Sequence, residues 1–102
     1  MDYCFDIDGT LCTNTDGDYA KAIPFNEQIM FVINLIENGN QVVFFTARGS
    51  KTGIDWSEFT KVQLEQWGIP NPVIFFGKPH ADLYIDDKAV ESNRYWLNQG
   101  IV

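Results

Sequence analysis

Length, composition and charge already exclude several classes of protein. The chain has 102 residues, of which 45% are hydrophobic and 15% aromatic. This composition suits one domain spanning residues 1–102 and is too apolar for a disordered segment. Seven basic and 14 acidic side chains give a net charge of −7. Because nucleic acids and anionic membranes bind basic surfaces, we expect neither as a partner.

We also expect no membrane anchor and no export signal. No apolar run approaches the ~18 residues that a membrane-spanning helix requires. The N-terminus lacks a basic stretch followed by an apolar one. Cys4 and Cys12 are too few for a disulfide framework, and their spacing differs from that of zinc ligands. The expectation is therefore a cytoplasmic protein with reduced cysteines.

Short apolar runs rich in β-branched and aromatic residues predict four strands. They cover residues 3–5, 41–45, 73–76 and 83–85. The two central runs are continuously apolar, as in strands that are buried on both faces. Helical patterns lie between the runs, and this alternation indicates an α/β fold with a parallel sheet.

Three helices are predicted from periodicity and from residues that begin or end helices. The first has Pro24 in its first turn and a stop at Gly39. The second begins at Asp55, which forms a capping-box-like pair with Glu58. A shorter one covers residues 89–97. The side chains expected to face the core are Ile29, Val32, Ile33 and Ile36 in the first helix and Phe59, Val62 and Trp67 in the second.

Polar side chains follow every predicted strand, and ligands of parallel sheets bind at the carboxyl ends of the strands. Four carboxylates at one edge repel each other by roughly 4 kcal/mol per pair at ~4 Å and a dielectric constant of ~20. A hard cation relieves this repulsion, and Mg²⁺ is the expected one. The side chains of Lys78 and Thr46 would donate hydrogen bonds to a phosphate. The residues of the predicted site are Asp6, Asp8, Thr46, Lys78, Asp86 and Asp87.

The same residues resemble the motifs of the haloacid dehalogenase-like (HAD) superfamily of phosphatases. Residues 5–11 (FDIDGTL) look like motif I, and Thr46 after an apolar strand matches motif II. Lys78 in residues 77–79 (GKP) matches motif III, and residues 84–87 (YIDD) match motif IV. The motifs occur in the family order. The resemblance implies a three-layer, Rossmann-like fold with a mostly parallel sheet of four or five strands.

The resemblance also implies a role for each motif residue. Asp6 would be the nucleophile that forms an aspartyl-phosphate. Asp8 would protonate the leaving oxygen and then activate water. Mg²⁺ would be held by Asp6, by the Asp8 carbonyl, and by Asp86 or Asp87 directly or through water. The residues expected to hold the phosphate or support its loop are Thr46, Lys78, Ala47 and Thr10.

Other residues near these motifs have weaker assignments. Arg48 and Lys51 are candidates to bind a distal charge of the substrate. Their place in a solvated loop without a ligand contact is almost as good an explanation of their charge. His80 is expected to be a structural or surface residue and not an acid–base group. Trp56 is expected to pack against a helix or to line the mouth of the site.

The spacing between motifs leaves no room for a cap domain, so the chain resembles the capless branch of the superfamily. Residues 13–21 and 49–55, or a neighbouring subunit, are candidates to cover the open site, and oligomerisation would also cover apolar surface. We expect a phosphatase acting on a small phosphate ester, such as a sugar phosphate or a nucleotide. The alternatives are a phosphotransferase or mutase that uses the same aspartyl-phosphate, and a non-catalytic regulatory domain.

Overall fold

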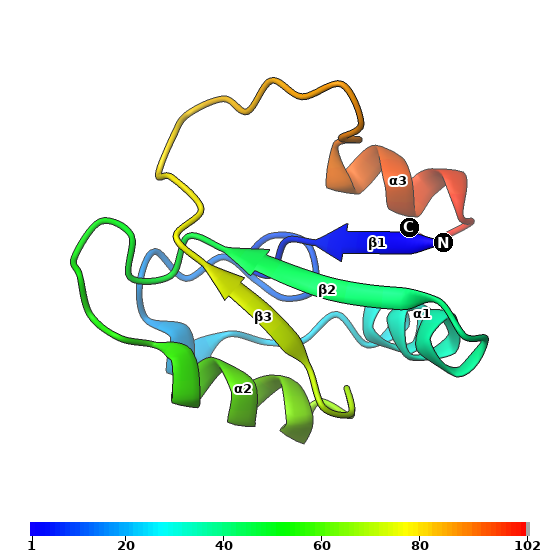
Figure 1. The fold of residues 1–102 in the computed structure, drawn as a ribbon, viewed down its shortest axis with the longest axis horizontal. Helices are drawn as coiled ribbons and strands as arrows, with labels where there is room; N and C mark the ends of the chain where they lie inside the picture. Colours follow the sequence, from blue (N-terminus) through cyan, green and yellow to red (C-terminus); the bar gives the residue numbers. More distant parts are fainter. Residues whose placement is uncertain (102) are drawn as a thin grey trace.

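The computed structural model describes residues 1–101 and contains a three-stranded parallel sheet with three α-helices (Figure 1). The sheet order is β1-β2-β3. Within these residues, no helix is long and apolar enough to cross a bilayer. The elements are β1 (Asp2–Phe5), the 3₁₀ helix η1 (Tyr19–Lys21), α1 (Asn26–Glu37), β2 (Gln41–Thr46), α2 (Ser57–Gln66), β3 (Val73–Phe76) and α3 (Ser92–Asn98).

One face of the sheet carries the core. Phe44 in the central strand pairs in register with Phe5 of β1 and with Ile74 of β3, so the three side chains share a face. The helices α1 and α2 lie together on one side of the sheet (Figure 1). Their residues Val32 and Leu64 are fully buried in the same cluster as Phe44. The expected small parallel α/β architecture is therefore present.

The opposite face of the sheet has no covering helix among residues 1–101. Cys4, Val43 and Val73 are aligned on that face, and Val73 is 51% exposed. The third helix lies beside the β1 edge instead (Figure 1), where Trp96 stacks on Phe5 with ring centroids 5.8 Å apart. The structure thus has one helical layer and an edge helix, where the resemblance implied a helical layer on each face.

The structure has three strands where four or five were expected. Residues 83–85 form no strand, and Leu83 and Ile85 are 74% and 91% exposed. The hydroxyl of Tyr84, between them, donates to the carbonyl of Pro79. The segment therefore folds back on its own chain and forms no backbone ladder with β1, which remains an edge strand.

The helices form close to where the sequence predicts them. α1 ends at Glu37, and Gly39 follows with φ +86°, a conformation that lets the chain turn back into β2. α2 begins two residues later than expected, because the Asp55 carboxylate accepts a hydrogen bond from the Ser57 amide at 2.9 Å. α3 begins at Ser92 instead of residue 89, and its N-terminus is capped by Glu91.

The predicted core face of the second helix is right for Trp67, which packs against the core just after α2, but wrong for Phe59 and Val62. Phe59 and Val62 are 37% and 40% exposed, whereas Thr60, Gln63 and Leu64 are buried. Two polar side chains thus replace two apolar ones on the inner face. They are turned inward because they bind a buried arginine of the site described below.

We predict that Phe44→Ala lowers the free energy of unfolding by about 3–5 kcal/mol, because it leaves a cavity under the central strand. Phe75→Ala is the matched control, since Phe75 is 55% exposed on the uncovered face. It should cost under about 1 kcal/mol. Urea unfolding followed by circular dichroism measures both, and equal losses would contradict the assignment of the core face.

Candidate active site

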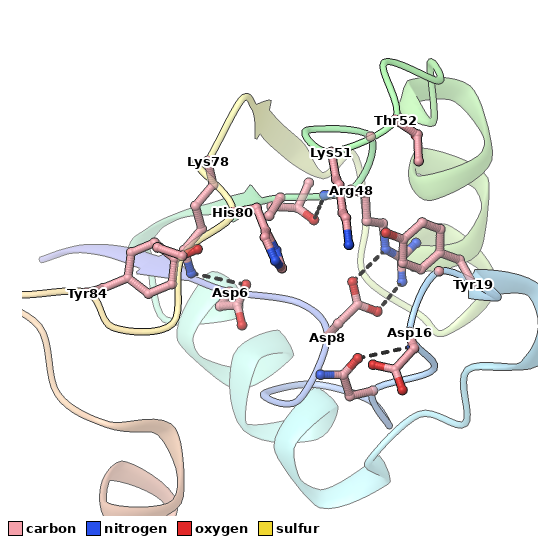
Figure 2. A pocket seen from close by; sticks show the side chains of 16 residues that line it. Asp6, Asp8, Asp16, Tyr19, Arg48, Lys51, Thr52, Lys78, His80 and Tyr84 are labelled. Carbon is pink, nitrogen blue, oxygen red and sulfur yellow. Dashed lines mark hydrogen bonds and ion pairs between the residues drawn. The ribbon is translucent and has the colours of Figure 1, made fainter.

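A cavity of about 420 Å³ lies where the carboxyl ends of the three strands meet (Figure 2). The structure brings to it residues that follow β1, end or follow β2, and follow β3. The sequence-predicted residues that line it are Asp6, Asp8, Thr46, Ala47, Arg48, Lys51 and Lys78. Parallel strands place their carboxyl ends on the same side of the sheet, and this explains the convergence.

Asp6 and Lys78 form an ion pair at the wall of the cavity. The Lys78 Nζ lies 3.4 Å from Asp6 Oδ1, and the Thr10 hydroxyl donates to Asp6 Oδ2 at 3.3 Å. The Lys78 amide donates to the carbonyl of Thr46 at 3.2 Å, which fixes the chain after β3 against the end of β2. The side chain of Asp6 remains 35% exposed, so a ligand in the cavity can reach it.

The loop after β1 is anchored in the core on both sides of Asp8. Ile7 and Leu11 are fully buried, and the Leu11 amide donates to the carbonyl of Ile7 at 2.8 Å. The indole of Trp96 donates to the carbonyl of Thr10 at 3.1 Å. Thr10 therefore supports the loop through its backbone as well as through its bond to Asp6.

Asp8 is paired with a buried arginine. Arg48 Nε and Nη2 each donate to one carboxylate oxygen of Asp8 at 2.9 Å, a bidentate pair. Arg48 is only 3% exposed, and its Nη1 donates to Thr60 at 3.2 Å and to Gln63 at 2.7 Å. The expectation of a solvated loop residue or a contact to a distal substrate charge does not fit this placement, because four hydrogen bonds already occupy the guanidinium.

Two loops form the rim of the cavity, as expected for the candidate covers. Asn14, Asp16 and Tyr19 come from the first loop, and Lys51 and Thr52 from the second. Lys51 is exposed and extends its amine toward the cavity (Figure 2).

The second loop contains a glycine that no other residue can replace without strain. Gly49 has φ +83°, and a Cβ added to it would collide with the Ile54 carbonyl. The loop therefore keeps the shape that brings Lys51 to the rim.

His80 and Tyr84 also line the cavity, although the sequence analysis assigned neither to the site. His80 points inward between the strand ends (Figure 2). The Tyr84 ring lies 4.5 Å from Lys78 Nζ in a cation–π contact. The signal in the sequence that could have placed His80 at the site is its position two residues after Lys78. Trp56 packs against helices, the first of its two expected roles: its ring centroid lies 4.9 Å from that of Tyr19 in η1 and 5.3 Å from that of Phe59 in α2.

Asp86 and Asp87 lie outside the cavity and are exposed. A hydrogen bond from the Lys88 amide to Asp86, at 2.9 Å, lowers the pKa of that carboxyl. Within residues 1–101, no group of three or more acidic, histidine or cysteine side chains is close enough to hold a metal ion. Asp6 forms an ion pair with Lys78, and Asp8 forms one with Arg48. As placed, these side chains do not form the predicted magnesium site.

Comparison with known proteins identifies the fold but no family. No family model and no curated protein matches the sequence. A crystal structure of a target protein from Vibrio cholerae is similar, with a TM-score of 0.77 and 27% sequence identity. The match covers 93% of this chain and 87% of that one. The small α/β fold is therefore shared with an experimentally determined structure over nearly its whole length.

The buried thiol of Cys12 lies behind Asp8 and is held in its neutral form. Burial, with the nearby Asp8 charge, raises the pKa of Cys12 from its ordinary value near 9 to about 12. Its Sγ donates to Asp8 Oδ1 at 3.6 Å. A neutral thiol is a poor nucleophile, so we assign Cys12 no part in the chemistry.

We predict that iodoacetamide at pH 8 labels Cys4 alone in the folded protein and both cysteines in denaturant. Cys4 is exposed, whereas Cys12 is fully buried with a raised pKa. Mass spectrometry counts the labels, and a Cys4→Ser variant should take none while folded. Labelling of Cys12 at the rate of Cys4 would contradict its burial.

Proposed function

We propose that this protein is a phosphohydrolase that cleaves phosphate monoesters through an aspartyl-phosphate on Asp6, as its resemblance to HAD phosphatases implies. The observation that supports this most is the juxtaposition of Asp6 and Lys78 in an open cavity with Thr46. A carboxylate nucleophile needs a nearby cation to approach an anionic phosphate. Lys78 pairs with Asp6 and also lines the cavity in which the phosphate would bind.

The proposed reaction has two steps. In the first, a carboxylate oxygen of Asp6 attacks phosphorus, the bond to the ester oxygen breaks, and Asp8, which must enter this step protonated, gives that oxygen its proton. In the second, Asp8 takes a proton from water, the water oxygen attacks phosphorus, and inorganic phosphate leaves Asp6 as a free carboxylate. Lys78 and the Thr46 hydroxyl would bind the phosphate oxygens in both steps.

Dependence on Mg²⁺ is part of the proposal and comes from the resemblance. Asp6 and the Asp8 carbonyl would supply two ligands. The third would come from Asp86 or Asp87, which requires residues 86–87 to approach the cavity that His80 and Tyr84 already line. When bound, the ion would offset the charge of the phosphate and of Asp6.

The dimensions of the cavity favour small substrates. Its volume of about 420 Å³ lies in the range typical of small-molecule sites. The rim offers Asn14, Asp16, Lys51 and Thr52 as hydrogen-bonding groups. We therefore propose a sugar phosphate or a nucleotide as the substrate, with release of free phosphate in preference to transfer to a second acceptor.

We predict that Asp6→Asn lowers phosphate release from a panel of phosphate esters to below about one-hundredth of the wild-type rate. The amide keeps the shape of the side chain but cannot form the acyl phosphate. Asp2→Asn, an exposed substitution at the start of β1, the strand that precedes Asp6, is the matched control and should retain activity. Near-normal turnover of the Asp6 variant would contradict the proposed nucleophile. Assaying phosphorylated acceptor beside free phosphate distinguishes hydrolysis from phosphotransfer.

Asp8→Asn should also remove turnover, but at a greater cost in stability. It leaves the buried Arg48 charge without its carboxylate, and breaking a buried pair costs about 3–5 kcal/mol. Asp6 is a partly exposed partner of Lys78, so its neutralisation costs much less. Unfolding curves for the two variants measure this difference, and equal stability would contradict it.

Removal of divalent cations tests the metal separately. We predict that EDTA abolishes phosphate release and that Mg²⁺ restores it, because the metal offsets the charge on the attacked phosphate. An Asp86→Asn variant should need more Mg²⁺ for half-maximal activity, with Asp82→Asn as the control on the same segment. Full activity in EDTA would contradict the metal requirement while leaving the nucleophile assignment open to the Asp6 test.

A further inference from the structure

We propose that Arg48 is a positioning residue, which orients the Asp8 carboxylate for proton transfer to the leaving group, and that Gln63 holds Arg48 in place. This inference rests on the proposed function, because it assigns Asp8 a proton-transfer role. It differs from the role expected from sequence, in which Arg48 would bind a distal charge of the substrate.

The geometry joins the Arg48 guanidinium to Asp8 and leaves it no contact with solvent. Both carboxylate oxygens of Asp8 accept from the guanidinium at 2.9 Å, and this fork restricts rotation of the carboxylate plane. The Arg48 side chain has no exposed area, whereas that of Asp8 is 17% exposed. Asp8 is therefore the more accessible member of the pair, and both of its carboxylate oxygens are directed at Arg48 (Figure 2).

The other side of the guanidinium is held by α2. Nη1 donates to Gln63 Oε1 at 2.7 Å and to Thr60 Oγ1 at 3.2 Å. These are the polar residues that occupy the inner face of α2 while Phe59 and Val62 are exposed. A buried ion pair is commonly less stabilising than well-packed apolar residues, so stability alone does not account for this arrangement. A requirement to fix Asp8 does account for it.

Gln63 also connects this network to the rim of the cavity. Its Nε2 donates to the carbonyl of Tyr19 at 2.8 Å, and the Tyr19 ring lies over the Arg48 guanidinium at 4.4 Å. The loop at the rim of the cavity and the arginine proposed to orient Asp8 thus share one side chain, Gln63. Loss of Gln63 should loosen both.

The positioning role of Arg48 predicts a particular kinetic signature. Phosphate binding is assigned to Lys78 and Thr46, so disturbing Arg48 should lower kcat and leave KM nearly unchanged. Proton donation matters most when the leaving oxygen is strongly basic. The loss should therefore be larger for phenyl phosphate than for 4-nitrophenyl phosphate, whose leaving group departs without a proton more easily.

The test compares Arg48→Lys with Arg94→Lys, an exposed arginine on α3, in Mg²⁺-containing buffer. Lysine keeps the charge but cannot form the bidentate fork. We expect kcat for phenyl phosphate to fall about 10- to 100-fold, with a smaller loss for 4-nitrophenyl phosphate. Arg94→Lys should match the wild type for both esters. Circular dichroism and thermal unfolding establish that each variant is folded.

Gln63→Met is the second variant and keeps the test decisive if Arg48→Lys does not fold. It leaves the Asp8–Arg48 pair intact and removes the anchor on α2, and Gln66→Met is its exposed control on the same helix. We expect at least about a threefold loss of kcat for phenyl phosphate, again larger than for the activated ester.

Each outcome decides one question. Equal losses of kcat/KM for the two esters, a change confined to KM, or wild-type kinetics in a folded variant would overturn the positioning role, because kcat/KM reports the step that expels the leaving group. Absence of phosphate-ester hydrolysis by the wild-type protein would overturn the proposed function, and the role of Arg48 would fall with it. Hydrolysis that survives in Asp6→Asn would likewise reject the nucleophile, whatever the Arg48 variants show.

Discussion

A buried arginine requires charge and hydrogen-bond partners inside the protein, and Arg48 is the residue around which this site is built. Its guanidinium binds Asp8 on one side and Thr60 and Gln63 on the other. This requirement explains why α2 presents polar side chains inward and leaves apolar ones exposed. It also links three segments distant in sequence, the loop after β1, the end of β2 and the middle of α2, across one wall of the cavity.

The parallel sheet provides the second constraint. Because all three strands run in the same direction, the residues that follow them share one edge, and the Asp6–Lys78 pair forms there without any long-range loop. The core beneath, centred on Phe44, holds the strand ends in register. Site and core are therefore consequences of the same alignment, one at the carboxyl ends of the strands and the other along one face.

The structure has fewer strands and fewer helical layers than the superfamily resemblance implied. Within residues 1–101 the β1 edge carries no further strand, one face of the sheet has no helix, and Asp86 and Asp87 lie away from Asp6. The first and the third of these features share one cause. Residues 83–85 were expected to add a strand, and a strand would have carried the two aspartates that follow it to the edge where Asp6 lies.

The sequence by itself determined the strand–helix alternation, the C-terminal end of α1 and part of the set of residues that line the cavity, because these depend on local periodicity, turn residues and strand order. The start of α1 was not among them, since the helix begins at Asn26 and Pro24 lies before it. Asp6, Asp8, Thr46 and Lys78 could be grouped by the simple rule that each follows an apolar run. Only the tertiary structure decided that Arg48 is buried, that Thr60 and Gln63 face inward, and that residues 83–85 remain outside the sheet. Hydrophobic periodicity cannot predict these features, since a polar side chain is buried only when distant segments supply its partners, and a short apolar run becomes a strand only when it pairs with a neighbouring backbone.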